Sequence, residues 1–275
     1  MTYDISLCSS HLDEDALLAR LSYSSVNVES GEINDGGAIY EGGSILPGDT
    51  WKKVDADRGR QILSGGKNID TSIGIHLSEK LLKDRLLELA TYRTDRAQAY
   101  EFPGDIFGTR KELGEALSNV DGIRLVGPLM DLVVGKSKGG LITTTTGDDS
   151  QRVGLHLDSW DHIREASGHG QMHARSNRIG YNAGDEDRFL LFVPRSVRMI
   201  QDMVIKKGLK REQDIISCFF ESYPNEKIYR LQIKPLEFYV APTENMIHDG
   251  STLGQTSSDI AIFVRGYILN DGKDY

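Results

Sequence analysis

The chain has 275 residues, 39% of them hydrophobic, and a mean hydropathy of −0.37, as is usual for a globular protein. No apolar run is long enough to span a bilayer, and the first residues carry neither a basic segment nor an apolar core, so we expect no membrane span and no signal peptide. The net charge of −9 argues against a general binder of nucleic acids or anionic membranes, because affinity for phosphates rests on Lys and Arg.

The N-terminal residues 1–121 are expected to supply helices and loops that pack on a β-rich core. Residues 10–23 begin with a helix-capping pattern and continue with helical apolar spacing. Residues 29–74 are polar and contain paired glycines, which predicts a long loop, either a cover over an active site or a plain surface loop. Leucines at helical spacing predict a helix over 77–100, and a shorter one is expected at 109–117.

From residue 122 the sequence becomes β in character, and residues 122–270 are expected to form the core of a single domain. Short segments rich in β-branched and aromatic residues are separated by turn residues, a pattern typical of a sandwich or jelly roll. Helices at 196–206 and 211–222 would form an insertion at about 195–223. Strands are expected at 123–134, 141–146, 152–160, 178–182, 188–193, 229–233, 236–240 and 259–268.

The segment 152–160 alternates between apolar and polar side chains. In a strand, His156 and Asp158 would project side by side from one face, and the apolar residues would share the other face: Val153, Leu155 and Leu157. An imidazole and a carboxylate at this spacing can occupy adjacent positions on a metal ion. The alternative is a half-buried strand in which the two side chains hydrogen-bond each other.

A third ligand for such a metal would come from a later part of the chain. His248 lies between two candidate strands, whereas the other histidines fall in the N-terminal half or in connections: His11, His76, His162, His169 and His173. Two histidines and one carboxylate on one face of a metal leave three positions open, the arrangement of non-haem Fe(II) oxygenases.

Arg265 stands in the otherwise apolar segment 259–268. A buried guanidinium needs a partner, because an unpaired charge in the interior is costly. A bound dicarboxylate could supply that partner through a bidentate contact. An internal salt bridge to an Asp or Glu is the equally weighted alternative.

The order of His-x-Asp, a distal His and an Arg on the last strand resembles the Fe(II)/2-oxoglutarate-dependent oxygenases. The resemblance covers residues 122–268 and implies a mainly β fold with flanking helices, built on a double-stranded β-helix of the jelly-roll or cupin type. It implies that Fe(II) is held by the three residues His156, Asp158 and His248. These would also be the catalytic residues.

The same resemblance places the cosubstrate 2-oxoglutarate against Arg265, helped by Tyr267, and leaves one metal position for O2. The gap from His248 to Arg265 is longer than in many branches of the family, so Arg178 and Arg188 are substitutes for the anchor. Oxidation of the substrate, for which hydroxylation is the expected form, is coupled to conversion of 2-oxoglutarate into succinate and CO2.

Other polar or aromatic residues near these segments have a functional and an ordinary interpretation. Trp160 could wall the substrate pocket or belong to the core. Tyr181 and Asn182 could reach the cavity or satisfy the following turn. The threonines of 143–146 could contact the cosubstrate or line an exposed strand, and Asp249 is expected to support a ligand or a turn.

The expected substrate is a small soluble metabolite, such as an amino acid or a natural-product intermediate, with no nucleic-acid or membrane partner. Two alternatives are a cupin-like metalloenzyme that does not use 2-oxoglutarate and a non-catalytic jelly-roll binding module. The two cysteines, Cys8 and Cys218, match no zinc or redox spacing, so we expect reduced thiols and a cytoplasmic location. No feature of the sequence sets an oligomeric state.

Overall fold

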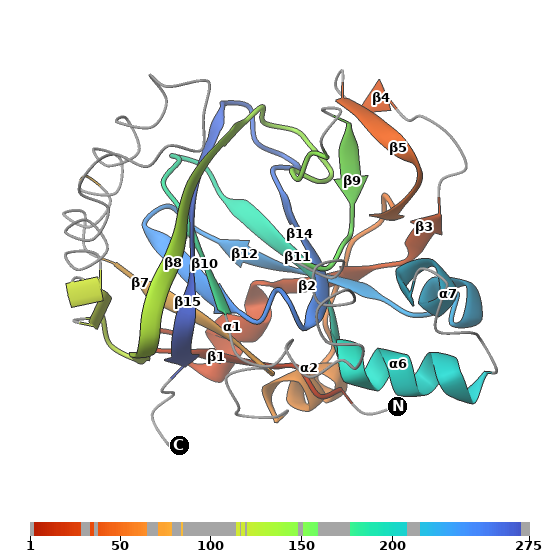
Figure 1. The fold of residues 1–275 in the computed structure, drawn as a ribbon, viewed down its shortest axis with the longest axis horizontal. Coiled ribbons are helices and arrows are strands. Elements are labelled where there is room, and N and C mark those ends of the chain that lie inside the picture. The colour runs from red at the N-terminus through yellow and green to blue at the C-terminus, as the bar shows by residue number, and fades with distance from the viewer. Residues whose placement is uncertain are drawn as a thin grey trace.

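The chain is mainly β, and its strands form two larger sheets that curl around a shared interior (Figure 1). The computed structural model describes residues 3–28, 34–35, 38–64, 71–78, 84, 114–115, 117–118, 120–147, 151–158, 177–207 and 215–270. The helices are α1 (Glu14–Ala19), α2 (Ala56–Leu63), α6 (Val197–Lys206) and α7 (Ile215–Ser222). The strands are β1 (Ser6–Ser9), β2 (Leu21–Ser24), β3 (Val26–Val28), β4 (Asn34–Asp35), β5 (Ala38–Pro47), β6 (Lys52–Lys53), β7 (Ser72–Leu77), β8 (Ile123–Ser137), β9 (Arg152–Gly154), β10 (Asn177–Asn182), β11 (Arg188–Ser196), β12 (Ile228–Ile233), β13 (Glu237–Ala241), β14 (Met246–Ser251) and β15 (Asp259–Asn270).

The two sheets interleave strands from distant parts of the chain. One has the order β1-β7-β13-β10-β15-β8, and the other has the order β14-β11-β12-β2-β6. A smaller sheet contains β3, β5 and β4, and β9 pairs in parallel with β5. From β8 onward the chain therefore passes back and forth between the two larger sheets.

Alternation of side chains along β11 separates the interior from the outer face. Leu190 and Phe192 belong to the apolar cluster between the sheets, whereas Leu191 and Val193 belong to the cluster that α6 and α7 cover. Figure 1 shows these two helices side by side at one edge of the molecule. Ser196 caps α6 by accepting a hydrogen bond from an amide of its first turn, as the predicted start of this helix required.

Most of the strands predicted after residue 122 are confirmed. β8, β10, β11, β12, β13 and β15 lie on the segments expected for them, and α6 and α7 lie on the predicted helices. The segment 141–146 is not a strand, because its ladder contact is a single bridge between Thr146 and Arg152. His248, which was expected between strands, lies within β14.

The expectation that residues 1–121 supply only helices and loops is wrong. β1 and β7 extend the six-stranded sheet, β2 and β6 extend the five-stranded one, and the predicted loop 29–74 contains β5, β6 and α2. The predicted helix 10–23 is reduced to α1, because the chain enters β2 at Leu21.

The predicted start of the long helix at Leu77 is also wrong, because Leu77 ends β7. The segment Ser72–Leu77 alternates apolar and small or polar residues with a period of two, which suits a strand. Residues 84, 114–115 and 117–118 are helical, and the rest of the predicted helices at 77–100 and 109–117 lies outside the described residues.

Two simple observations bear on the expectations from composition. Cys8 and Cys218 form no disulfide. Within the described ranges, no helix is both long and apolar enough to cross a membrane.

His76 lies in β7, inside the six-stranded sheet, and not outside the strand series as expected. Its side chain is 1% exposed and stacks on Phe238, with ring centroids 5.3 Å apart. Nε2 lies 3.1 Å from Asn270 Oδ1 and Nδ1 lies 3.2 Å from Ser10 Oγ. Nδ1 also lies 3.2 Å from Asp121 O. In a neutral imidazole Nε2–H can donate to Asn270 while Ser10 donates to Nδ1, and the Asp121 carbonyl then receives no hydrogen from this ring.

The buried His76 predicts a loss of stability in acid. Burial lowers the pKa of His76 from 6.5 to about 4. The unfolded chain therefore binds this proton more readily between those pH values, and the free energy of unfolding falls as the pH drops from 6.5 to 4. The pKa difference of His76 between the folded and unfolded chain contributes about 3 kcal/mol to the free energy of unfolding, because each pKa unit corresponds to about 1.4 kcal/mol.

Urea unfolding of wild type and His76→Gln at pH 7 and pH 4 measures this contribution. The glutamine amide keeps the hydrogen bonds to Ser10 and Asn270 but does not titrate. We expect the wild type to lose about 3 kcal/mol more than the variant between the two pH values. An equal loss in both proteins would contradict the assignment.

Candidate metal centre

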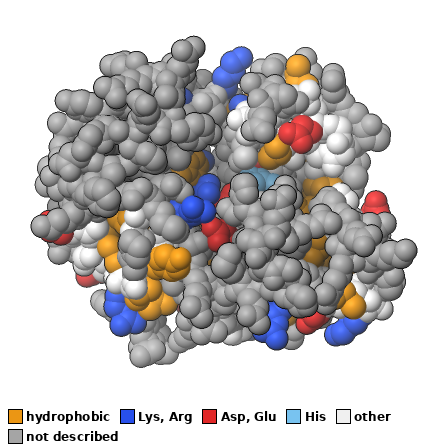
Figure 2. Space-filling model, viewed as in Figure 1, with side chains coloured by type: hydrophobic (Ala, Val, Ile, Leu, Met, Phe, Trp, Pro, Cys, Tyr) orange, Lys and Arg blue, Asp and Glu red, His pale blue; other side chains and the backbone are white. Residues whose placement is uncertain are grey.

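The three residues predicted as metal ligands come together between the two sheets. His156 Nε2 lies 3.6 Å from Asp158 Oδ1, and His248 Nε2 lies 3.6 Å from Asp158 Oδ2. One possible ligand atom from each residue lies within 4.8 Å of the others, so the group could hold a metal ion. Figure 2 shows a histidine beside acidic and basic side chains near the middle of the molecular face.

A backbone pairing sets the two imidazoles side by side. His156 N donates to His248 O at 3.0 Å, and His248 N donates to His156 O at 2.9 Å. Directly opposed residues of an antiparallel pair project from the same face. The ring centroids are accordingly 4.8 Å apart.

The strand predicted over 152–160 ends at Gly154, where φ is +73°. A Cβ at this position would lie 2.7 Å from the carbonyl oxygen of Ile45, so glycine alone fits the turn. Beyond it the predicted apolar face is confirmed for Leu155 and Leu157, which pack in the outer cluster. His156, on the polar face, therefore pairs with β14 through an isolated bridge to His248 and not as part of a continuous strand.

Hydrogen bonds fix the tautomers that a metal requires. His156 Nδ1 lies 3.0 Å from Gly154 O, and His248 Nδ1 lies 3.1 Å from Met246 O. A carbonyl oxygen only accepts, so each Nδ1 carries its hydrogen. In the neutral rings the Nε2 lone pairs then face Asp158, which is the arrangement of histidine ligands held by a backbone carbonyl.

Asp158 is suited to be an anionic ligand. Oδ2 is buried and makes no hydrogen bond among the described residues, although Arg178 Nη2 lies 3.0 Å away. Burial raises the pKa of this carboxyl, but His248, His156 and Arg178 together hold it well below the usual range. The carboxylate therefore stays charged, and each of its two oxygens lies 3.6 Å from the Nε2 atom of one imidazole, which fits a bound cation.

The two histidines differ in protonation when no metal is bound. Burial lowers the pKa of His248 to about 4. Burial also lowers the pKa of His156, but the nearby carboxylates of Asp158 and Asp249 outweigh it and raise the pKa. The proton thus resides on His156, and a metal cation would replace it.

Asp249 supports this arrangement from the other face of β14. Its side chain is fully buried, and Oδ1 accepts hydrogen bonds from Thr144 N, Thr145 N and Thr145 Oγ1. Oδ2 lies 3.5 Å from His156 Nδ1. Thr144 and Thr145, expected in a strand or against the cosubstrate, thus belong to a loop that holds Asp249.

Arg265, the predicted cosubstrate anchor, has an internal carboxylate partner. Its Nη1 lies 3.2 Å from Glu244 Oε1, which is the salt bridge that the sequence left as an alternative. Arg265 lies directly opposite Arg178 in the ladder of β10 and β15. Tyr267 is half-buried, and its role stays a prediction.

Arg188 is the most deeply buried of the three candidate arginines. It is 1% exposed, and its Nη1 lies 3.4 Å from Asp259 Oδ2. Nε and Nη1 make no hydrogen bond with any described residue. Its Nη2 lies against Gly250, since a Cβ there would be 2.8 Å away, and its guanidinium lies 5.4 Å from the centre of the Phe263 ring.

Tyr239 is a site residue that sequence reasoning missed. It is 3% exposed and its ring covers Gly180, where a Cβ would lie 2.4 Å from the phenol oxygen. Burial raises the pKa of Tyr239 to about 12, although Arg188 and Arg178 lower it. The side chain is therefore a neutral donor beside two guanidinium groups. Only its place on the interior face of an alternating strand could have identified it.

The remaining candidates do not reach the centre. Tyr181 packs in the cluster on the outer face of the six-stranded sheet, and Asn182 binds the turn through Glu186 O and Gly184 N. His11 pairs with Glu237 at 3.0 Å. Outside the described residues lie Trp160, His162, His169 and His173.

Comparisons with known proteins add little to this geometry. No family model and no curated protein matches the chain. The crystal structure of HygX from Streptomyces hygroscopicus with iron bound is similar at a TM-score of 0.31 and 8% identity, over 74% of this chain and 83% of that chain. A similarity this low identifies neither fold nor function, so function is argued from the site.

The centre predicts that each of the three residues is required for metal binding. Wild type incubated anaerobically with Fe(II) and then desalted should retain about one equivalent, and His248→Ala or Asp158→Ala should weaken binding by more than about 100-fold. Elemental analysis measures the retained metal. His11→Ala is the matched control and should behave as wild type; retention of metal by His248→Ala would contradict the site.

Asp249 predicts a smaller effect, because it acts on the metal through His156. We expect Asp249→Asn to bind Fe(II) or Co(II) about 10–100-fold more weakly than wild type, since it loses the charge beside Nδ1. Anaerobic calorimetry measures the affinity. Thr145→Val removes one hydrogen bond to the same carboxylate and should have the lesser effect; an unchanged affinity in Asp249→Asn would rule out the supporting role.

Proposed function

We propose that the protein is a non-haem Fe(II)/2-oxoglutarate-dependent dioxygenase that oxidises, in the simplest case hydroxylates, a small soluble metabolite. The observation that carries this proposal is the convergence of His156, Asp158 and His248, whose possible ligand atoms all lie within 4.8 Å of one another. Both imidazoles are held through Nδ1, and the carboxylate remains charged. Two histidines and one carboxylate on one face leave room for a cosubstrate and O2.

The strand order supports a double-stranded β-helix as the core. The first sheet contains the run β8-β15-β10-β13, and the second contains β14-β11-β12. The bridge between His156 and His248 adds the segment after β9 beside β14. Apart from β11 and β12, which are neighbours in the second sheet, successive strands thus alternate between two facing sheets, with the metal centre between them.

We place the remote carboxylate of 2-oxoglutarate on Arg188. Arg265 already pairs with Glu244, and Arg178 contacts the metal ligand Asp158. Arg188 is buried and retains two nitrogens without hydrogen bonds. A carboxylate ligand would satisfy them, and Asp259 keeps the guanidinium neutralised when no ligand is bound.

The position of Arg188 along the sheet suits a short dicarboxylate. Its Nη2 lies against Gly250, which follows His248 by two residues on the same face of β14. Two residues of a strand span roughly 7 Å. A five-carbon molecule with a carboxylate at each end can therefore reach from the metal centre to the guanidinium.

Tyr239 would be a second donor to the same carboxylate. Its raised pKa keeps the phenol protonated at neutral pH, and Arg188 is the charged group that lowers this pKa most. A neutral hydroxyl and a guanidinium fork together recognise a carboxylate by charge and direction. Gly180 leaves the space that the Tyr239 ring occupies.

The residues of the centre and the apolar cluster have different roles in the proposed reaction. Bound Fe(II) with 2-oxoglutarate supplies the oxidation, in which O2 is consumed and succinate and CO2 are formed. His156 and His248 would bind the metal as neutral ligands and Asp158 as the anion, while Arg178 Nη2 lies 3.0 Å from Asp158 Oδ2. The apolar cluster between the sheets lines the interior and would help to exclude water from the centre.

A specific observation favours a second candidate, the cupin-like metalloenzyme without 2-oxoglutarate. Arg188 and Arg265 each have a carboxylate partner, Asp259 and Glu244. Such pairs would make the arginines structural. Nuclear magnetic resonance of 2-oxoglutarate incubated with the Fe(II) protein in air separates the two, because only the dioxygenase forms succinate.

The anchor assignment predicts different effects at two arginines. In protein loaded with Mn(II), Arg188→Gln should weaken 2-oxoglutarate binding by about 10–100-fold, because a charge-assisted contact is lost. Arg265→Gln should change it less than about twofold, and metal affinity should stay constant in both. Calorimetry under nitrogen measures both affinities. Loss of 2-oxoglutarate binding in Arg265→Gln alone would make Arg265 the anchor.

A further inference from the structure

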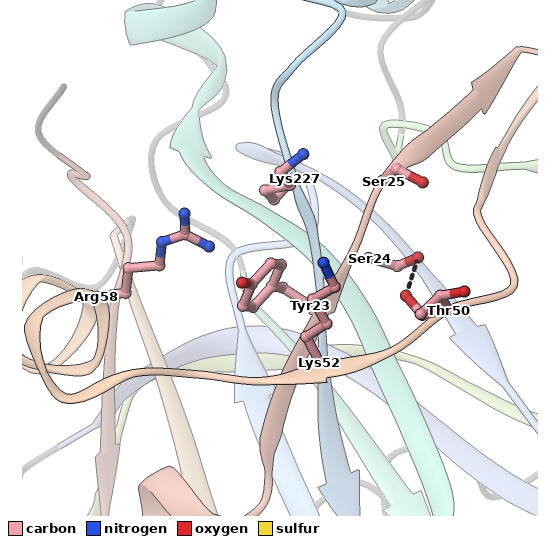
Figure 3. A pocket seen from close by; sticks show the side chains of 7 residues that line it. All are labelled: Tyr23, Ser24, Ser25, Thr50, Lys52, Arg58 and Lys227. Carbon is pink, nitrogen blue, oxygen red and sulfur yellow. Dashed lines mark hydrogen bonds between the residues drawn. The ribbon is translucent and has the colours of Figure 1, made fainter.

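A pocket lies at the edge of the five-stranded sheet that is remote from the metal centre (Figure 3). Its volume is about 440 Å³, and its walls come from β2, β6, α2 and the residue before β12. In the sheet, β11 and β12 separate β14, which carries His248, from β2. At about 4.8 Å per strand, the pocket lies roughly 14 Å from the metal centre.

Three cations and no carboxylate line this pocket. They are Lys52, Arg58 and Lys227, whose basic groups lie around the ring of Tyr23 in Figure 3. Lys52 and Lys227 form no ion pair with any residue that the structure describes. In a chain with a net charge of −9, a concave cluster of three cations, two of them without an ion pair among the described residues, favours an anionic ligand.

Arg58 is held in place but retains donors. Its guanidinium lies 4.5 Å from the centre of the Tyr23 ring, and its Nε lies 3.5 Å from Asp55, the N-cap of α2. Nη1 is buried and has no hydrogen-bond partner among the described residues. Stacking on Tyr23 therefore orients the Arg58 guanidinium before a ligand binds, which lowers the entropic cost of binding.

Hydroxyl groups form the opposite side of the pocket. Ser24 Oγ lies 2.7 Å from Gly48 O and 2.9 Å from Thr50 O, which ties the segment before β6 to β2. Ser25 and Thr50 line the same pocket, and neither hydroxyl makes a hydrogen bond within the described part of the chain. They add neutral donors to the three cations.

We propose that this pocket binds the phosphoryl group of a small phosphorylated molecule. One arginine fork would satisfy a carboxylate, which has two oxygens. A guanidinium, two ammonium groups and nearby hydroxyls instead match a dianion with three terminal oxygens. The volume of about 440 Å³ exceeds that of a phosphate ion and leaves space for an organic part. The site is independent of the metal centre and of the function proposed for it.

Calorimetry at low ionic strength tests this proposal on the full chain with glycerol 3-phosphate, inorganic phosphate and glycerol as probes. We expect saturable binding of the phosphate ester, weaker binding of inorganic phosphate and none of glycerol. Arg58→Gln, Lys52→Gln and Lys227→Gln should each weaken the ester by about tenfold, the loss of one charge-assisted contact.

Lys53→Gln is the matched control, because Lys53 adjoins Lys52 in β6 and is exposed but does not line the pocket. It should change the affinity less than twofold. Equal losses in Lys52→Gln and Lys53→Gln, or no saturable binding of the ester, would overturn the proposal. Equal affinity for ester and inorganic phosphate would overturn the assignment of a phosphorylated molecule. If Arg58→Gln fails to fold, the two lysine variants decide.

Discussion

The two backbone hydrogen bonds between His156 and His248 hold the candidate metal centre together. They join the segment that follows β9 to β14, the edge strand of the five-stranded sheet. Because opposed residues share a face, both imidazoles turn to the interior, and Asp158 follows two residues later. The turn at Gly154 is a condition for this pairing, since a side chain there would meet the backbone of Ile45.

Charge balance is the second constraint on the interior. Arg178, Arg188 and Arg265 pair with Asp158, Asp259 and Glu244 respectively, so each guanidinium has a carboxylate close by. These pairs lower the cost of burying charge before any ligand binds. The three ion pairs do not satisfy every guanidinium nitrogen, because two nitrogens of Arg188 make no hydrogen bond with the described residues. A carboxylate ligand can therefore contact Arg188 without displacing Asp158 from Arg178.

Local patterns predicted most of the strands after residue 122 and the three residues of the candidate centre, because alternation and residue type are both local properties. The N-terminal strands could not be predicted in the same way. β2 pairs with β12 and β7 pairs with β13, so their partners lie far along the chain. The choice among the arginines also needed the structure, since burial and the partner of each side chain depend on tertiary packing. Asp249 and Tyr239 acquire their roles from contacts across the sheets.

The central claim is that the His156, Asp158 and His248 centre holds Fe(II) together with 2-oxoglutarate. Anaerobic titration of the protein with Fe(II) and 2-oxoglutarate tests it most directly, by the weak metal-to-ligand charge-transfer band in the visible spectrum. The account predicts that the band appears in wild type and is absent from His248→Ala. Iron binding without the band would contradict the use of 2-oxoglutarate, and failure to bind iron would contradict the metal centre itself.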